Sequence, residues 1–156
     1  NHLAQVWFDE RLRAKSAYNG FKGTAAAVAA LIDERVDASW VYTTTGVKYS
    51  DKLRMLAVAM DKRHAKFPNV PTFRELGYDF VGGAYRGISV PNTTPEDIQM
   101  KISKIFAKID RDPAYLAEKT ALGFVPLSVR YKEIPAFMTS RRVEYLPLAR
   151  EAGLID

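Results

Sequence analysis

The segment at residues 53–60 constrains the fold of this chain more than any other feature of the sequence. It is almost continuously apolar, and charged residues border it on both sides. A strand with apolar residues at successive positions, instead of at every second position, is typical of a parallel sheet covered on both faces. The sequence therefore predicts a buried strand of a mostly parallel sheet at residues 53–60.

Predicted helices and strands alternate along the chain. We expect helices at residues 3–12, 25–35, 95–109, 113–122 and 131–150, and strands at residues 16–18, 36–41, 53–60, 85–90 and 124–127, with a further short strand at Phe80. Pro95 suits the first position of its helix, Gly123 suits a helix end, and Pro147 predicts a bend. This alternation indicates an α/β fold and not a helical bundle or a β-sandwich.

Composition places the chain among folded domains with a mildly basic surface. Its 156 residues are 47% hydrophobic and 12% aromatic, which is enough apolar material for the core of one domain. The net charge of +5 is spread along the chain without a long run of like charges. Such a distribution favours a solvated basic surface over a nucleic-acid-binding arm.

Several kinds of chemistry have no residues to support them. Cysteine is absent, which excludes disulfides, thiol catalysis and Cys-ligated metals. His2 and His64 are far apart, and neither has a second metal ligand four residues away. No Gly-x-Ser-x-Gly or Ser-x-x-Lys motif occurs, and the glycines at 82 and 83 lack the dinucleotide-binding spacing. We expect no catalytic residue, no metal and no cofactor.

The ends of the sequence and its apolar segments carry no visible targeting signal. No apolar segment approaches the roughly 18 residues of a membrane span. The opening residues, Asn1-His2-Leu3, show no secretory leader and predict the start of a helix with Asn1 as its N-cap.

The turn at residues 19–24 is the strongest candidate for a binding site. Its glycines, including Gly23, lead directly into a predicted helix, so that the unpaired backbone N–H groups of Thr24, Ala25 and Ala26 lie at the positive, outward-facing end of the helix dipole. Such a cradle suits a carboxylate or a phosphate, although the glycine spacing is not that of a P-loop. A purely structural role for Thr24, as the N-cap of the helix, remains the alternative.

Two other places are candidates for contact with an anion. Thr43 and Thr44 follow a predicted strand, and in α/β folds ligands bind outside the carboxyl ends of strands. The alternative for both threonines is a helix cap or a β-branched strand end. Tyr85 and Arg86 suit either an anion contact or ordinary packing and surface charge.

A series of short motifs resembles the extracytoplasmic solute receptors of tripartite tricarboxylate transporters, often called Bug receptors. The motifs follow the family's order: Asn1-His2-Leu3, Asn19-Gly20-Phe21-Lys22-Gly23-Thr24, Val36-Asp37 with Thr43 and Thr44, Leu56-Ala57-Val58, Val70-Pro71-Thr72, Glu75-x-Gly77, Gly87-x-x-x-Pro91 and Thr94-Pro95. Each motif is weak alone, and the whole series in register makes the resemblance specific.

The resemblance implies a two-lobed α/β clamp that holds the carboxylates of a ligand between its lobes. Residues 1–83 would form most of the second lobe, a periplasmic-binding-protein-like lobe with a mostly parallel sheet flanked by helices. Residues 84–156 would cross to the first lobe and supply its C-terminal helices, while the rest of that lobe would be absent. Site residues carried over from this resemblance are Asn1, Gly23, Thr24, Ala25, Thr43, Thr44 and Tyr85.

The resemblance also implies a ligand, a location and partners. Some family members carry an acidic residue where Val41 stands, so we expect a purely anionic ligand here: a di- or tricarboxylate or an aromatic acid. The receptor would be periplasmic and would dock to membrane subunits of the transporter. Apolar surface left open by the absent lobe predicts self-association of this chain.

Two other classes of function stay open at this point. A basic nucleic-acid-binding domain fits the pI near 9.4, but aromatic-basic clusters and a recognition motif are missing. An enzyme of unknown type is the weaker alternative, because no catalytic constellation is visible.

Overall fold

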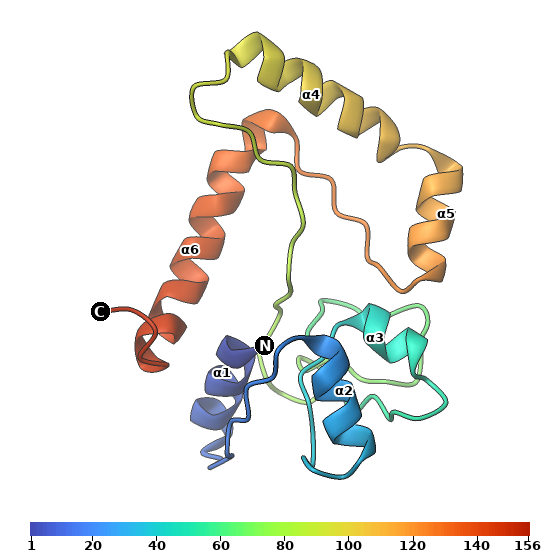
Figure 1. Cartoon of the computed structure of the whole chain (residues 1–156), viewed down its shortest axis with the longest axis vertical. Coiled ribbons are helices and arrows are strands. Elements are labelled where there is room, and N and C mark those ends of the chain that lie inside the picture. Colours follow the sequence, from blue (N-terminus) through green and yellow to red (C-terminus); the bar gives the residue numbers. More distant parts are fainter.

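The computed structural model, which describes residues 1–156, consists of helices joined by long extended segments (Figure 1). The elements are α1 (His2–Leu12), α2 (Thr24–Ile32), α3 (Thr43–Lys48), α4 (Glu96–Ile109), α5 (Pro113–Ala121), the 3-10 helix η1 (Tyr131–Glu133) and α6 (Ile134–Glu151). No helix has both the length and the apolarity that crossing a membrane requires.

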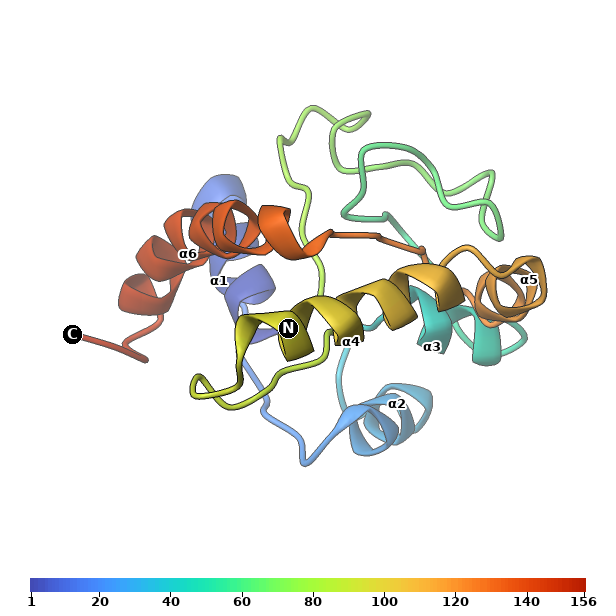
Figure 2. The ribbon, with the colours of Figure 1, turned by 90° about the horizontal axis from the view of Figure 1, so that it is seen from above.

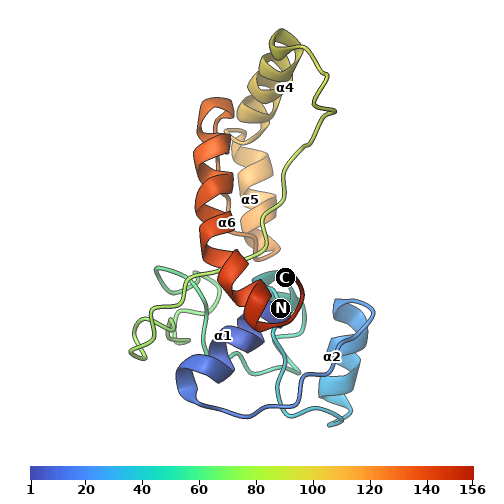
Figure 3. The same ribbon diagram turned by 90° about the vertical axis from the view of Figure 1, so that its left-hand side faces the viewer.

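The helices divide into two parts, which Figure 1 shows one above the other. The lower part contains α1, α2, α3 and the loops that follow them, and the upper part contains α4, α5 and the first half of α6. An extended segment climbs from the lower part to α4, and α6 returns to pack on α1 (Figure 3). Seen from above, α6 lies over α1 and α5 lies over α3 (Figure 2). The two parts therefore meet at two places.

Local signals explain where the clearest helices begin and end. Pro95 is the N-cap of α4, and Glu96 and Asp97 in the first turn oppose the helix dipole. The Asp112 carboxylate caps α5 by accepting a hydrogen bond from the Tyr115 N–H at 2.9 Å. The helices expected at residues 95–109 and 113–122 are confirmed to within one residue, because their capping residues act over a single turn.

The predicted parallel sheet is not confirmed. The single β-pairing is an isolated parallel bridge between Val58 and Thr72. Around it, the Val58 N–H donates to the Pro71 carbonyl at 3.0 Å, and the Gly82 N–H donates to the Ala59 carbonyl at 3.1 Å. The direction of this pairing is parallel, as expected, but it does not extend into a ladder.

The other predicted strands are extended or bent segments without paired neighbours. Residues 16–18, 36–41, 85–90 and 124–127 form no strand. A strand gains its backbone hydrogen bonds only from an aligned neighbour, and these segments lie apart from one another. Within residues 53–57, Arg54 and Leu56 are exposed while the alternate residues are half-buried, so burial on both faces was also a wrong expectation.

A small aromatic core holds the lower part together. Trp7 from α1, Phe73, Phe80 and Leu148 from α6 form one buried cluster, against which Trp40 packs. The Trp7 and Phe80 rings stack with their centroids 4.2 Å apart, and the Trp40 and Phe73 rings stack at 5.7 Å. Burial of aromatic surface is the main stabilising contribution here, and it holds the middle of α1 beside the segment at Trp40 that leads into α3.

Candidate functional site

The start of α2 offers backbone N–H groups without protein acceptors. Gly23 is the N-cap, with φ 106° and ψ 169°, a conformation that strongly favours glycine. The first hydrogen bond of the helix runs from the Ala27 N–H to the Gly23 carbonyl at 3.3 Å. The N–H groups of Thr24 and Ala25 precede that bond and donate to no protein atom. The site predicted from the glycine turn therefore has the donors that an anion needs.

The structural alternative for Thr24 is wrong. Thr24 is the first residue inside α2, one position after the N-cap, and no side chain caps this helix. Thr24 is half-buried and Ala25 is exposed, so a ligand at this helix start would meet both the hydroxyl and the N–H groups.

Thr43 and Thr44 open a short helix instead of ending a strand. Tyr42 is the N-cap of α3, which begins at Thr43. The Thr43 hydroxyl donates to the Gly123 carbonyl at 2.8 Å, whereas the half-buried hydroxyl of Thr44 forms no hydrogen bond with the protein. The Thr43 hydroxyl therefore joins α3 to the residue that follows the end of α5, whereas the Thr44 hydroxyl has no protein partner.

Asn1 connects the start of α1 to the segment before α3. Asn1 occupies the predicted N-cap position, but its side chain makes no capping hydrogen bond. Its Nδ2 donates instead to the Trp40 carbonyl at 2.7 Å, and the Trp40 indole N–H donates to Gln5 Oε1 at 2.8 Å. In Figure 1, α1 and α2 both begin at the edge of the lower part that faces the upper part. The beginnings of two predicted binding segments thus share one edge of the molecule.

Tyr85 lies against α6, apart from the other predicted residues. Its hydroxyl accepts a hydrogen bond from Arg141 Nη1 at 3.1 Å, and its ring meets the Phe137 ring edge-on at 5.0 Å. Arg141 also pairs with Glu144 at 2.6 Å. Desolvation acts to lower the pKa of Arg141, but Tyr85 and Glu144 outweigh it, so that this pKa is raised.

A neighbouring tyrosine ties the extended segment to the same helix. The Tyr145 hydroxyl donates to the Gly83 carbonyl at 3.3 Å, and burial raises the pKa of the phenol. Together with Tyr85, this contact fixes the path of the chain where it leaves the lower part.

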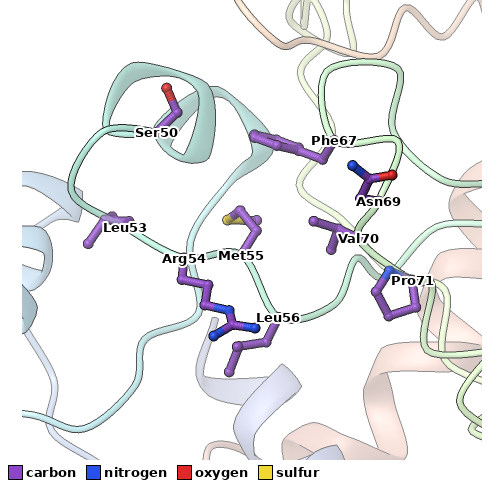
Figure 4. A pocket seen from close by; sticks show the side chains of 9 residues that line it. All are labelled: Ser50, Leu53, Arg54, Met55, Leu56, Phe67, Asn69, Val70 and Pro71. Atoms are coloured by element: carbon purple, nitrogen blue, oxygen red, sulfur yellow. The ribbon is translucent and has the colours of Figure 1, made fainter.

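An open cavity of about 410 Å³ lies beside residues 53–56 and was not predicted (Figure 4). Its lining comes from Ser50, Leu53, Arg54, Met55, Leu56, Phe67, Asn69, Val70 and Pro71. In Figure 4, Arg54 and Leu56 point to one side of the segment and Met55 points to the other, toward Phe67. Arg54, a charged residue inside the apolar run at residues 53–60, is the sequence feature from which an exposed surface here could have been expected. None of the predicted site residues lines the cavity.

Three arginines of the lower part form ion pairs with nearby carboxylates. Arg74 pairs with Asp61 and, at 2.7 Å, with Asp79, and Arg63 pairs with Glu75 at 3.0 Å. No group of three or more His, Asp or Glu side chains is placed to hold a metal ion.

Similar proteins support the family resemblance. The family model described as "Tripartite tricarboxylate transporter family receptor" matches residues 1–154. The "UPF0065 protein in gbd 5'region" of Cupriavidus necator is 30% identical over 125 residues, which cover 70% of this chain and 38% of that protein. Protein BugT of Bordetella pertussis is 26% identical over 155 residues, which cover 97% of this chain and 48% of that protein.

A solved structure gives the same answer for the fold. The crystal structure of a TctC solute binding protein from Polaromonas, determined without ligand, superimposes with a TM-score of 0.76 at 25% sequence identity. The superposition covers 96% of this chain and 53% of the Polaromonas chain, so the fold is of the periplasmic-binding-protein type. Nothing in these similarities supports the nucleic-acid-binding alternative, and the matched family is one of receptors, not enzymes. The chain spans between 38% and 53% of the length of these proteins, and it belongs to the receptor family of the tripartite tricarboxylate transporters.

Proposed function

We propose that the chain forms part of an extracytoplasmic receptor that captures a small carboxylate for a transporter of the tripartite tricarboxylate type. The observation that carries this proposal is the start of α2, where Gly23 leads into N–H groups of Thr24 and Ala25 that have no protein acceptor. Hydrogen bonds from N–H groups to a carboxylate are charge-assisted, and each contributes roughly 1.5–3 kcal/mol.

Capture would combine this helix start with a polar group near it. One ligand carboxylate would accept hydrogen bonds at α2, and the Thr44 hydroxyl would donate to a second acceptor on the ligand. The residues proposed to bind ligand are those of the sequence prediction: Asn1, Gly23, Thr24, Ala25, Thr43, Thr44 and Tyr85. The contact with Trp40 holds Asn1 at the edge of the lower part where α1 and α2 begin. The contact with Arg141 holds Tyr85 on the extended segment that leads to α4.

We assign residues 1–83 to the second lobe of a clamp and residues 84–156 to the crossover and to the C-terminal helices of the first lobe. The support is that the aromatic core draws mainly on residues before 83, while α4 and α5 contain no buried residue. The parallel bridge at Val58 would be the start of the mostly parallel sheet that a complete lobe contains.

The ligand would be a di- or tricarboxylate or an aromatic acid. Val41, an apolar residue, stands before α3 where an amino acid's ammonium group would need an acidic partner. By family, we place the receptor in the periplasm and make the membrane subunits of the transporter its partners.

We also propose that this chain self-associates through α4. The apolar stripe of this helix consists of Ile98, Ile102, Ile105, Phe106 and Ile109. Within it, the exposed fractions of Ile105 and Phe106 are 58% and 39%. Analytical ultracentrifugation of the chain and of an Ile105→Glu variant would test this: the variant is expected to remain monomeric at concentrations where the parent associates.

The test of binding compares two substitutions at one position. Thr24→Val removes the hydroxyl and keeps the N–H, whereas Thr24→Pro removes both and suits the first position of a helix. Calorimetric titration with a dicarboxylate, a tricarboxylate, an aromatic acid and an amino acid should show one acid binding the parent chain. Thr24→Pro should lower the affinity for that acid by about tenfold or more, and Thr24→Val should lower it by less, because the hydrogen bonds from the N–H groups are the larger contribution to binding.

Two results would count against the proposal. Equal affinity of Thr24→Pro and the parent chain would remove α2 from the site, and an amino acid that bound more tightly than every simple acid would overturn the ligand class. Far-UV circular dichroism of both variants provides the control that α2 still forms.

A further inference from the structure

One backbone carbonyl joins three segments that are distant in the sequence. The Gly123 carbonyl, just beyond the end of α5, accepts a hydrogen bond from the Thr43 hydroxyl at 2.8 Å. The same carbonyl lies 3.2 Å from Nε2 of His64, whose side chain is buried with an exposed fraction of 4%. Both lone pairs of the carbonyl oxygen are therefore used by side chains of the lower part.

The second ring nitrogen of His64 determines which tautomer is present. Nδ1 accepts a hydrogen bond from the Lys66 backbone N–H at 3.1 Å, so this nitrogen carries a lone pair and no proton. In the neutral imidazole the proton then resides on Nε2, which donates it to the Gly123 carbonyl. The Phe67 ring, with its centroid 5.3 Å from that of the imidazole, packs beside the ring. His64 is thus held at both nitrogens and acts as a directed donor.

Gly123 can approach this closely only because it has no side chain. Its φ of 86° lies in the left-handed region, and a Cβ there would stand 2.7 Å from Val47 Cγ2 and 3.2 Å from the Thr43 carbonyl oxygen. The backbone at the end of α5 consequently rests directly on α3. Figure 1 shows α5 descending to α3 at this point, away from the other meeting place between α6 and α1.

We propose that His64 is a positioning residue. Its hydrogen bond to the Gly123 carbonyl, together with the one from Thr43, holds the end of α5 against the start of α3, and we call this pair of contacts the clasp. The clasp fixes Thr43 between the two parts of the molecule. The importance of Thr43 rests on the proposed function, because Thr43 is one of the residues proposed to bind ligand. The clasp between the two parts does not depend on the proposed function. His64 contacts no ligand in this account, and it acts through Gly123 and Thr43.

The clasp predicts a defined pattern among substitutions at one position. His64→Gln keeps a side-chain N–H that can reach the Gly123 carbonyl, while His64→Ala removes the donor and leaves a cavity. The matched control is His2→Gln, which changes the one other histidine of the chain, a residue stacked on Tyr18 and remote from the clasp in its contacts.

Two measurements test the clasp in the intact chain. In the His2→Gln variant a single histidine remains, so nitrogen NMR of its ring should show Nε2 protonated and Nδ1 unprotonated. Hydrogen exchange followed by mass spectrometry should show His64→Ala exchanging about tenfold faster in residues 119–124 and 43–48 together, as expected for loss of a buried hydrogen bond. His64→Gln should restore protection in both segments.

The outcomes separate this inference from the proposed function. A proton on Nδ1, or exchange in His64→Ala that rises around residue 64 without changing at residues 119–124, would overturn the clasp. If the acid identified by calorimetry binds the parent chain, His64→Ala should lower the affinity for that acid and His64→Gln should retain the parent's affinity. Absence of acid binding by the parent would contradict the proposed function, and the ring tautomer and the exchange pattern would still decide the clasp.

Discussion

Phe73 and Phe106 are the same residue type, but one is buried and the other is exposed. Phe73 lies in the aromatic core of the lower part with an exposed fraction of 8%, whereas Phe106 lies on α4 with an exposed fraction of 39%. The core joins α1, the loop at residues 70–80 and the end of α6, while α4 and α5 bury no residue at all. Both regions have apolar side chains at suitable spacing, and only the first has surfaces from several segments to cover them.

This difference shows that helix formation and helix burial have separate causes. The caps and charges of α4 act within one turn, so the helix forms where its sequence predicts. Burial requires a second surface, and in α4 the apolar stripe meets few other elements. Long-range stability is therefore concentrated in the lower part and in the contacts that α6 and Gly123 make with it.

Alanine at each of the two phenylalanines should produce the largest contrast. Phe73→Ala is expected to lower the free energy of unfolding by about 3–5 kcal/mol, because it leaves a cavity among stacked rings. Phe106→Ala should cost about 1 kcal/mol or less, as is usual for a surface position. Urea denaturation followed by tryptophan fluorescence measures both. Equal losses would mean that α4 packs as well as the core does.

Glycine positions give the next contrast, between a crowded and an open site. Gly123→Ala should lower the free energy of unfolding by about 1–2 kcal/mol because position 123 has a left-handed backbone. Overpacking against Val47 should lower it by a further amount of roughly 1–3 kcal/mol. Gly77, with φ 90°, has nothing within 4 Å of the position that a Cβ would occupy, so Gly77→Ala should show the backbone cost alone. The difference between the two unfolding free energies measures the contact of α5 with α3, and no difference would contradict that contact.

The smallest effect concerns an exposed ion pair in the lower part. The Arg63 guanidinium, together with the Thr72 N–H, holds the pKa of Glu75 below its usual value. The unfolded chain therefore binds this proton more readily, and the pair's contribution is present above about pH 4.5 and lost as the pH falls through the lower folded value. Urea midpoints between pH 6 and pH 3, roughly the range that spans carboxylate titration, should fall less in Glu75→Gln than in the parent.

Glu118, an exposed residue of α5, serves as the control for that measurement, because none of the ion pairs in the structure includes it. Glu118→Gln should reproduce the pH dependence of the parent chain. The same response in Glu75→Gln and Glu118→Gln would show that the Arg63 pair does not contribute to stability.

The helices were more predictable than the strands. Pro95, Asp97 and Asp112 mark helix starts through interactions that span a few residues, so the sequence contains the whole signal. A strand depends on a neighbour elsewhere in the chain, and the run at residues 53–60 found one partner residue, at Thr72. The short helix α3 was missed because its threonines also suit a strand end.

The candidate site was predictable in part for the same reason. The glycine at position 23 and the helix after it form a local unit, and both appear where the sequence placed them. Tyr85 was grouped with that unit in the prediction, but its contacts with Arg141 and Phe137 are set by the path of α6. Its place could not be derived from neighbouring residues.

By itself, the sequence determined the helices other than α3, the free N–H groups at the start of α2 and the family to which the chain belongs. Each of these depends on short motifs, in which propensity, capping and backbone conformation act over one or two turns. Tertiary structure alone decided that Thr43, His64 and Gly123 meet, across separations of 80 and 59 residues along the chain. Bringing such distant segments together costs chain entropy that no local pattern records, and the packing of α5 on α3 together with the hydrogen bonds to the Gly123 carbonyl compensates for it.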